Sequence, residues 1–282
     1  MVNEGARMLD LDVVGGTHVF GPLAVLSAMF LSLVSSAVWS RNVGETSCGW
    51  RTDYSPDGRA FGIWALIYTS TLGVCIAQLT SLVPVFDWWA HFFWGLTWVF
   101  CALWVPLFDA EYPGALRAAM LQILSAAACA TVAVWRAGMW LGEERTGTVN
   151  LGWPLTILAG WLLTASSINV GIAWKASQPN ATKVCVTVPP QRPGESARDY
   201  RTRRRVLYRE AYAKAPVVVS FVPVVLAAAI GGLAVLVRDP LLTVPVAWAV
   251  VNLKAFPCCE YLVAVLLCGC GSAGAVVRIF MM

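Results

Sequence analysis

"WWAHFFWGLTWVFCALWVPLF" occupies residues 88 to 108, and His91 is its only titratable side chain other than Cys101. About 20 apolar residues are enough to cross the hydrocarbon core of a bilayer as one α-helix. Lipid supplies no hydrogen-bond partners to the backbone, so only helices and closed barrels can span it. This stretch therefore predicts a membrane-spanning helix.

Runs of the same kind recur along the whole chain. It has 282 residues, of which 58% are hydrophobic and only 13% are charged, whereas about a quarter of the residues in soluble domains are charged. The sequence predicts an all-α, polytopic transmembrane helix bundle of five helices followed by two or three more. The other runs cover residues 19–39, 61–83, 115–141, 152–174, 217–237, 241–256 and 261–280. The 241–256 run is short and contains Pro245 and Lys254, so a tilted crossing and a re-entrant helix both remain open.

Lysine and arginine residues predict the orientation, because cytoplasmic loops carry more of them. With eight crossings, fifteen basic residues fall on one side and five on the other. This bias places the loop between residues 175 and 214 inside and the N-terminus outside. The N-terminus contains Glu4, Asp10 and Asp12 and lacks both an early apolar core and an arginine-rich pattern. We therefore expect the first membrane helix to direct insertion.

Tryptophan divides the chain into parts of different composition. Thirteen of the fourteen tryptophans lie at or before Trp174. We expect a five-helix core over residues 1–176, a basic loop rich in Pro and Arg over 177–215, and a C-terminal transmembrane extension over 216–282. The loop reads either as an ordinary solvated inside loop or as a docking site for anionic lipid headgroups or an acidic partner.

No catalytic arrangement is visible in the sequence. The chain has two histidines, no Ser/His/Asp set and no phosphate-binding loop. Five of the nine cysteines lie inside apolar runs, where free thiols behave as small apolar residues. His91 has no identifiable partner for haem ligation, so we expect a structural role for it. These features predict a protein that is not an enzyme, holds no metal and binds no nucleic acid.

Several aromatic residues lie deeper than the membrane interfaces, where Trp and Tyr usually gather. Trp64 and Tyr68 are four residues apart and share a helix face, and Gly62, Thr69, Gly73 and Ala77 form a small-residue stripe that predicts close helix contact. The other deep aromatic residues are Trp94, Trp98, Trp104 and Trp161. A buried indole N–H needs a partner, and Asn169, Gln78 and Gln122 are the nearest amides in the sequence. This pattern fits either an aromatic core or a flat apolar pocket with few polar groups.

Three stretches carry a resemblance to a known family. They are "PDGRAFGIWALIY" (56–68), "CALWVPLFDAEYPGALRAAMLQILSAAACATVAVW" (101–135) and "LAGWLLTASSINVGIAWK" (158–175). Together they resemble the translocator protein / tryptophan-rich sensory protein (TspO/MBR) family over about residues 15–176. Cys101 stands where many members have asparagine, and the C-terminal extension has no counterpart in the short members.

The resemblance implies a five-helix bundle that binds porphyrins, sterols or aromatic ligands beneath a loop after the first helix. It implies that residues 41–60 form this lid and that the ligand-binding residues are Trp64, Tyr68, Trp98, Trp104, Trp161 and Asn169. No cofactor is certain, and a porphyrin, haem or lipid is the expected ligand.

Two functions remain open at this point. The chain either binds, transports or senses a flat hydrophobic small molecule such as a tetrapyrrole, or it is a structural subunit that reuses the fold inside a larger membrane complex. Both give it membrane lipids as neighbours and a homo-oligomer or larger assembly as context. The resemblance favours a mitochondrial membrane.

Overall fold

The computed structural model describes residues 4–40, 43–50, 58–80, 86–140, 152–179 and 191–200, with residues 202, 203, 206, 244, 245 and 248. The predicted C-terminal helices over 217–237 and 261–280 lie outside the described residues, as do most of 241–256 and much of the 177–215 loop.

The described chain is helical throughout its long segments. The elements are α1 (Glu4–Trp39), α2 (Val43–Gly49), η1 (Gly58–Gly62), α3 (Ile63–Leu79), α4 (Trp88–Asp109), α5 (Pro113–Trp140) and α6 (Trp153–Ala176). In the described part, five helices are long and apolar enough to cross a membrane, and they correspond to the first five predicted runs. The chain is thus an integral, multi-pass membrane protein with an all-α bundle.

Two helix boundaries differ from the apolar runs. The helix α1 begins at Glu4, ahead of the apolar run at Val19, and no proline before Pro22 interrupts its backbone hydrogen bonds. The helix α3 ends at Leu79, where the Thr80 backbone N–H bonds back to the carbonyl of Ile76. Sequence hydropathy alone extended this helix to residue 83.

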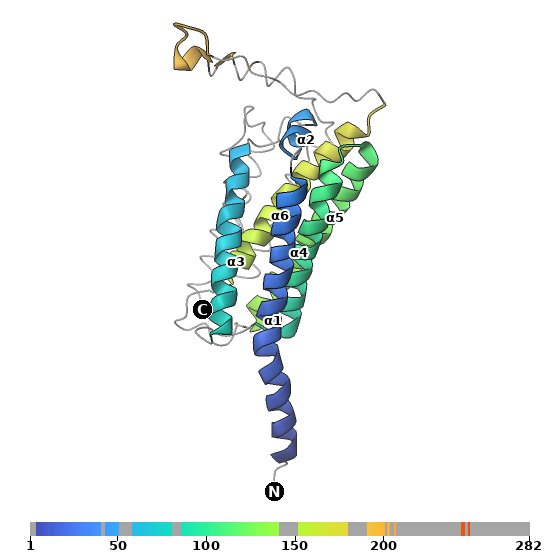
Figure 1. Ribbon diagram of the computed structural model, residues 1–282, viewed down its shortest axis with the longest axis vertical. Coiled ribbons are helices and arrows are strands. Elements are labelled where there is room, and N and C mark those ends of the chain that lie inside the picture. Colours follow the sequence, from blue (N-terminus) through green and yellow to red (C-terminus); the bar gives the residue numbers. More distant parts are fainter. Residues whose placement is uncertain are drawn as a thin grey trace, which may run out of the picture.

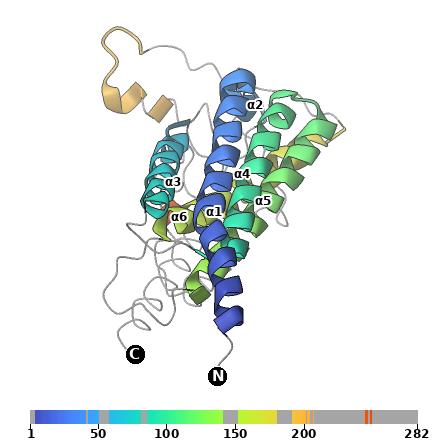
Figure 2. The ribbon, with the colours of Figure 1, turned by 60° about the horizontal axis from the view of Figure 1, so that its bottom comes forward.

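The five long helices form a closed ring. Around this ring the order is α1, α3, α6, α5 and α4, so α6 closes the gap between α3 and α5. Both views show α1 between α3 and α4, with the short α2 above one end of the bundle (Figure 1, Figure 2). Helices that follow each other in sequence are therefore not always neighbours, since α3 and α4 are separated by α1.

Two features help the helices of the ring to pack closely. They are small side chains on α5 and a hydrogen bond from α1 to a carbonyl of α4. The alanines along one side of α5 are buried, including Ala119, Ala126 and Ala130 at 0% exposure. Pro106 lies inside α4 and has no N–H to offer the carbonyl of Ala102. The Ser35 hydroxyl of α1 donates to that carbonyl at 2.7 Å, which satisfies it and joins α1 to α4.

The predicted small-residue stripe on α3 makes no close helix contact within the described bundle. Gly62, Thr69 and Gly73 are exposed, and a Cβ added at Gly73 would meet nothing within 4 Å. The close approach occurs instead at Gly21 of α1, where an added Cβ would lie 2.8 Å from Cγ of His91.

His91 belongs to a polar cluster at the end of the bundle opposite α2. Its ring nitrogens lie 3.1 Å from the carbonyl oxygen of Asp87 and 3.1 Å from Oε1 of Gln78 on α3. The Asp87 side chain accepts from the Ala90 N–H and forms an ion pair with Arg136 of α5. The cluster joins three helices, which fits the structural role expected for His91.

Candidate ligand-binding cavity

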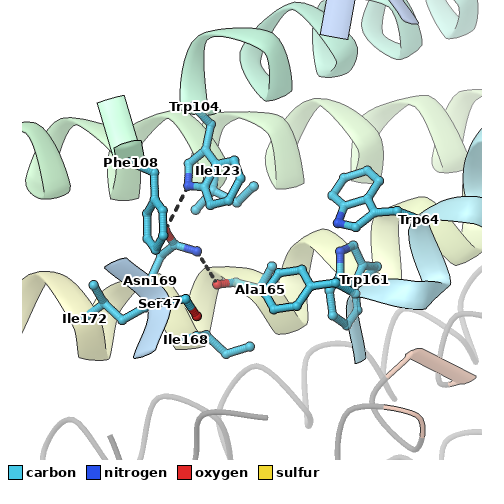
Figure 3. A pocket seen from close by; sticks show the side chains of 11 residues that line it. Ser47, Trp64, Trp104, Phe108, Ile123, Trp161, Ala165, Ile168, Asn169 and Ile172 are labelled. Atoms are coloured by element: carbon cyan, nitrogen blue, oxygen red, sulfur yellow. Dashed lines mark hydrogen bonds between the residues drawn. The ribbon is translucent and has the colours of Figure 1, made fainter. Parts of the chain in front are cut away.

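A cavity lies inside the ring near the end that carries α2. Its free volume is about 30 Å³. Its wall comes from α2, η1 and the four helices α3 to α6. The lining residues are Ser47, Phe61, Trp64, Trp104, Phe108, Ile123, Trp161, Ala165, Ile168, Asn169 and Ile172 (Figure 3).

Helical spacing on α6 supplies nearly half of this wall. Trp161, Ala165, Ile168 and Ile172 follow one another at intervals of three or four residues, which places them on one face of a helix. On the opposite wall, Trp104 and Phe108 of α4 are also four apart, and their rings stack with centroids 4.8 Å apart. The cavity thus has flat apolar walls on two sides.

The Asn169 side chain at one end of the cavity already has hydrogen-bond partners within the protein. The indole N–H of Trp104 donates to Oδ1 of Asn169 at 2.9 Å, and the Asn169 amide donates to the carbonyl of Ala165 at 2.9 Å (Figure 3). These bonds join α4 to α6 across the cavity. Asn169 therefore satisfies one of the deep indoles, as its position in the sequence suggested.

The other end of the cavity contains an unpaired donor. Trp161 is 1% exposed, and its indole nitrogen is buried without a hydrogen-bond partner among the described residues. Trp64 faces it with an edge-to-face contact at 6.4 Å between ring centroids, and the two indole nitrogens point toward each other (Figure 3). An unsatisfied buried donor costs about 1–3 kcal/mol. A ligand that carries an acceptor would remove that cost.

Two predicted site residues lie behind the wall rather than in it. Tyr68 stacks on Trp98 with centroids 4.9 Å apart, and Trp98 contacts Trp64 at 6.2 Å. The Tyr68 hydroxyl lies 3.2 Å from the hydroxyl of Ser32 on α1. Tyr68 and Trp98 thus support the ring of Trp64, while Trp64, Trp104, Trp161 and Asn169 line the cavity itself.

The short helix α2 covers the mouth of the cavity. Thr46 is fully buried and donates its hydroxyl to Oε1 of Glu111 at 2.7 Å. The ammonium group of Lys175, at the end of α6, lies 3.4 Å from the carbonyl of Gly49. Glu111 has φ of 64°, in the left-handed region that non-glycine residues rarely adopt. These contacts hold α2, which contributes Ser47 to the cavity wall. Residues 41, 42 and 51–57 of the predicted lid lie outside the described residues.

Other deep polar groups have different partners from those the sequence suggested. Gln78 bonds to His91 rather than to an indole. The indole nitrogens of Trp94 and Trp98 and the Oε1 of Gln122 are buried without partners among the described residues.

Sequence reasoning missed seven lining residues. Ala165, Ile168 and Ile172 could have been found from their helical spacing relative to Trp161, and Phe108 from its spacing relative to Trp104. Phe61 is three residues before Trp64, and Ser47 lies within the predicted lid, 41–60. Ile123 carries no such signal, because only the folded ring brings it to the cavity.

The cavity wall is uncharged and largely apolar. None of its lining residues carries a charge, and no group of three His, Cys, Asp or Glu side chains in the described part could hold a metal ion. Flat rings, branched aliphatic side chains and one unpaired donor suit a planar apolar molecule with an acceptor.

These features define a class: a multi-pass helical membrane protein with an aromatic cavity inside a closed five-helix ring. The family model of TSPO-like proteins matches residues 18–187. The chain belongs to the TSPO-like family, as the motifs indicated. No curated protein and no solved structure gives a significant match to it.

Proposed function

We propose that the protein binds a flat hydrophobic molecule, such as a tetrapyrrole, in the cavity beneath α2. The observation that carries this proposal is the buried, unpartnered indole N–H of Trp161 at the cavity wall. A donor kept dry and unpaired is unfavourable in the empty protein, and an acceptor on a ligand would compensate for it. Family membership supports the same role, and it favours a mitochondrial membrane as the location.

Binding of a molecule this large requires the cavity to open. The cavity's free volume is about 30 Å³, room for only a few waters and far below the roughly 300–1,000 Å³ of usual small-molecule sites. The short helix α2 contributes Ser47 to the wall. We therefore expect α2 to move away before a tetrapyrrole enters.

Titration with protoporphyrin, followed by the shift of its Soret absorbance, tests the proposal. We expect Trp161→Ala combined with Asn169→Ala to weaken binding at least tenfold, about 1.4 kcal/mol. Trp161→Phe keeps an aromatic ring but removes the donor together with part of the ring surface, so it should weaken binding by at least roughly threefold. Trp135→Phe is the matched control, because Trp135 is exposed on α5. Wild-type affinity in a folded double variant would contradict the assignment.

The small volume of the cavity also fits a second function. A ring whose interior is filled by its own aromatic side chains could act as a structural subunit of a membrane complex. Native gel electrophoresis after purification in mild detergent separates the two functions. A small particle that binds protoporphyrin supports the first, and a much larger particle with other subunits and no titratable ligand supports the second.

A further inference from the structure

The helix α6 is covered on the side that faces away from the cavity. In its most apolar stretch 89% of residues are buried, against 28% to 50% in the other four membrane helices. Leu163 and Val170 lie about 180° to 200° around the helix from Trp161, yet neither is exposed. The neighbours α3 and α5 flank α6 within the ring. Since α3 and α5 flank α6 on its two sides, the outer side of α6 must be covered by another segment or molecule.

The side chains on this outer side suit a protein neighbour better than lipid. Ala159 and Ser166 are 0% exposed, and Thr156 and Ser167 are 2% and 3% exposed. Small residues of this kind let another helix approach closely in a membrane. The hydroxyl of Ser166 bonds to the carbonyl of Leu162 in its own helix, so the surface presents no unpaired group. By contrast, α1 exposes large apolar side chains, with Phe20 at 67% and Phe30 at 66%.

The described residues of the C-terminal segment contact the bundle at η1. The indole N–H of Trp248 donates to the carbonyl of Ala60 in η1 at 2.9 Å, and Pro245 is buried. The segment also contains the apolar runs at 217–237 and 261–280, each long enough to lie in the membrane next to α6.

We propose that residues 216–282 pack against the outer side of α6, and that Trp248 holds them to η1. The partner of this surface is then a segment of the same chain. Ala60 directly precedes Phe61, and Trp64 follows one turn later, and both of these residues line the cavity. Trp248 is thus a positioning residue for one cavity wall, and this role stands whether or not the cavity binds a tetrapyrrole.

Photo-crosslinking of the full-length protein in lipid nanodiscs tests the covering of α6. The probe is p-benzoylphenylalanine in place of Leu163 or Val170, with Leu31 as the control position because it is 52% exposed on α1. We expect peptides from residues 216–282 to be crosslinked from α6 without a change in the monomer mass, and lipid alone from Leu31. A doubled mass, a foreign protein or lipid adducts from α6 would each overturn the proposal.

Hydrogen exchange tests the role of Trp248 without any ligand. Trp248→Phe keeps an aromatic ring but removes the donor to Ala60. The amides of residues 58–66 should exchange about threefold to tenfold faster in this variant, the range expected for one hydrogen bond. Trp135→Phe should leave them unchanged. Equal exchange in the wild type and in Trp248→Phe would show that Trp248 does not position this cavity wall.

Discussion

The bond between Thr46 and Glu111 should decide how often α2 lifts from the cavity. Thr46→Val keeps the shape of a fully buried side chain and removes only its hydroxyl. A hydrogen bond to a charged acceptor contributes about 1.5–3 kcal/mol. We take the lower value, because Glu111 is partly accessible to water. Losing this hydrogen bond then raises the equilibrium constant for opening of α2 about tenfold.

Hydrogen exchange measured by mass spectrometry on detergent-solubilised protein would report this opening. Amides of residues 43–50 should lose roughly tenfold in protection, while those of α4 and α6 keep theirs. Thr69→Val is the matched control, because that hydroxyl is exposed and bonds within its own helix at Ala65. Unchanged protection at 43–50, or a parallel loss in every helix, would refute the reasoning.

Glu111→Gly sharpens the same test. It removes the acceptor but also relieves a left-handed backbone conformation that costs a non-glycine residue about 1–2 kcal/mol. Protection of α2 should therefore fall as in Thr46→Val, while the stability of the whole bundle changes little. The double variant with Thr46→Val should show no further loss of α2 protection, because both changes remove one shared interaction.

Two further predictions concern packing and pH. Gly21→Ala should destabilise the bundle by about 1–3 kcal/mol in detergent unfolding, since its Cβ would clash with the His91 ring. Gly73→Ala should not destabilise it, and equal effects would contradict the packing account. In the 191–206 region, hydrogen bonds from Arg203 lower the pKa of Glu195 from 4.5 to about 2. A carboxyl group whose pKa is lowered in the folded state stabilises that state at pH values above its ordinary pKa. This contribution is lost as the pH falls toward the lowered pKa. The Arg203 Nε–H resonance should hence change between pH 4.5 and 2 in an NMR titration and lack this transition in Glu195→Gln; a wild-type resonance that stays constant across this range would refute the assignment.

Local sequence predicted the parts of the fold that depend on local properties. Run length and hydropathy located the five membrane helices. The resemblance to the TspO/MBR family implied that Trp161 and Asn169 border the cavity, and both lie among its lining residues. In each case a single helix carries the signal, so its period is visible in the sequence.

The rest depends on how separate helices meet. The seven residues of α2 have no apolar periodicity, and contacts with Glu111 and Lys175 hold this helix in place. Whether Asn169 would meet Trp104 or another indole depends on the register of two helices 65 residues apart in sequence. Gln78 looked equally suited to an indole, but the fold brings it to His91 instead.

The position of α6 in the ring has a consequence for biogenesis. As the last of the five helices to be synthesised, it carries five of the lining residues and closes the gap between α3 and α5. A nascent chain that has inserted only α1 to α5 therefore has an open aromatic groove that includes Trp64 and Trp104. The cavity comes into existence only when the ribosome has passed residue 172, so a chain truncated before Trp153 inserts four spanning helices and has no site.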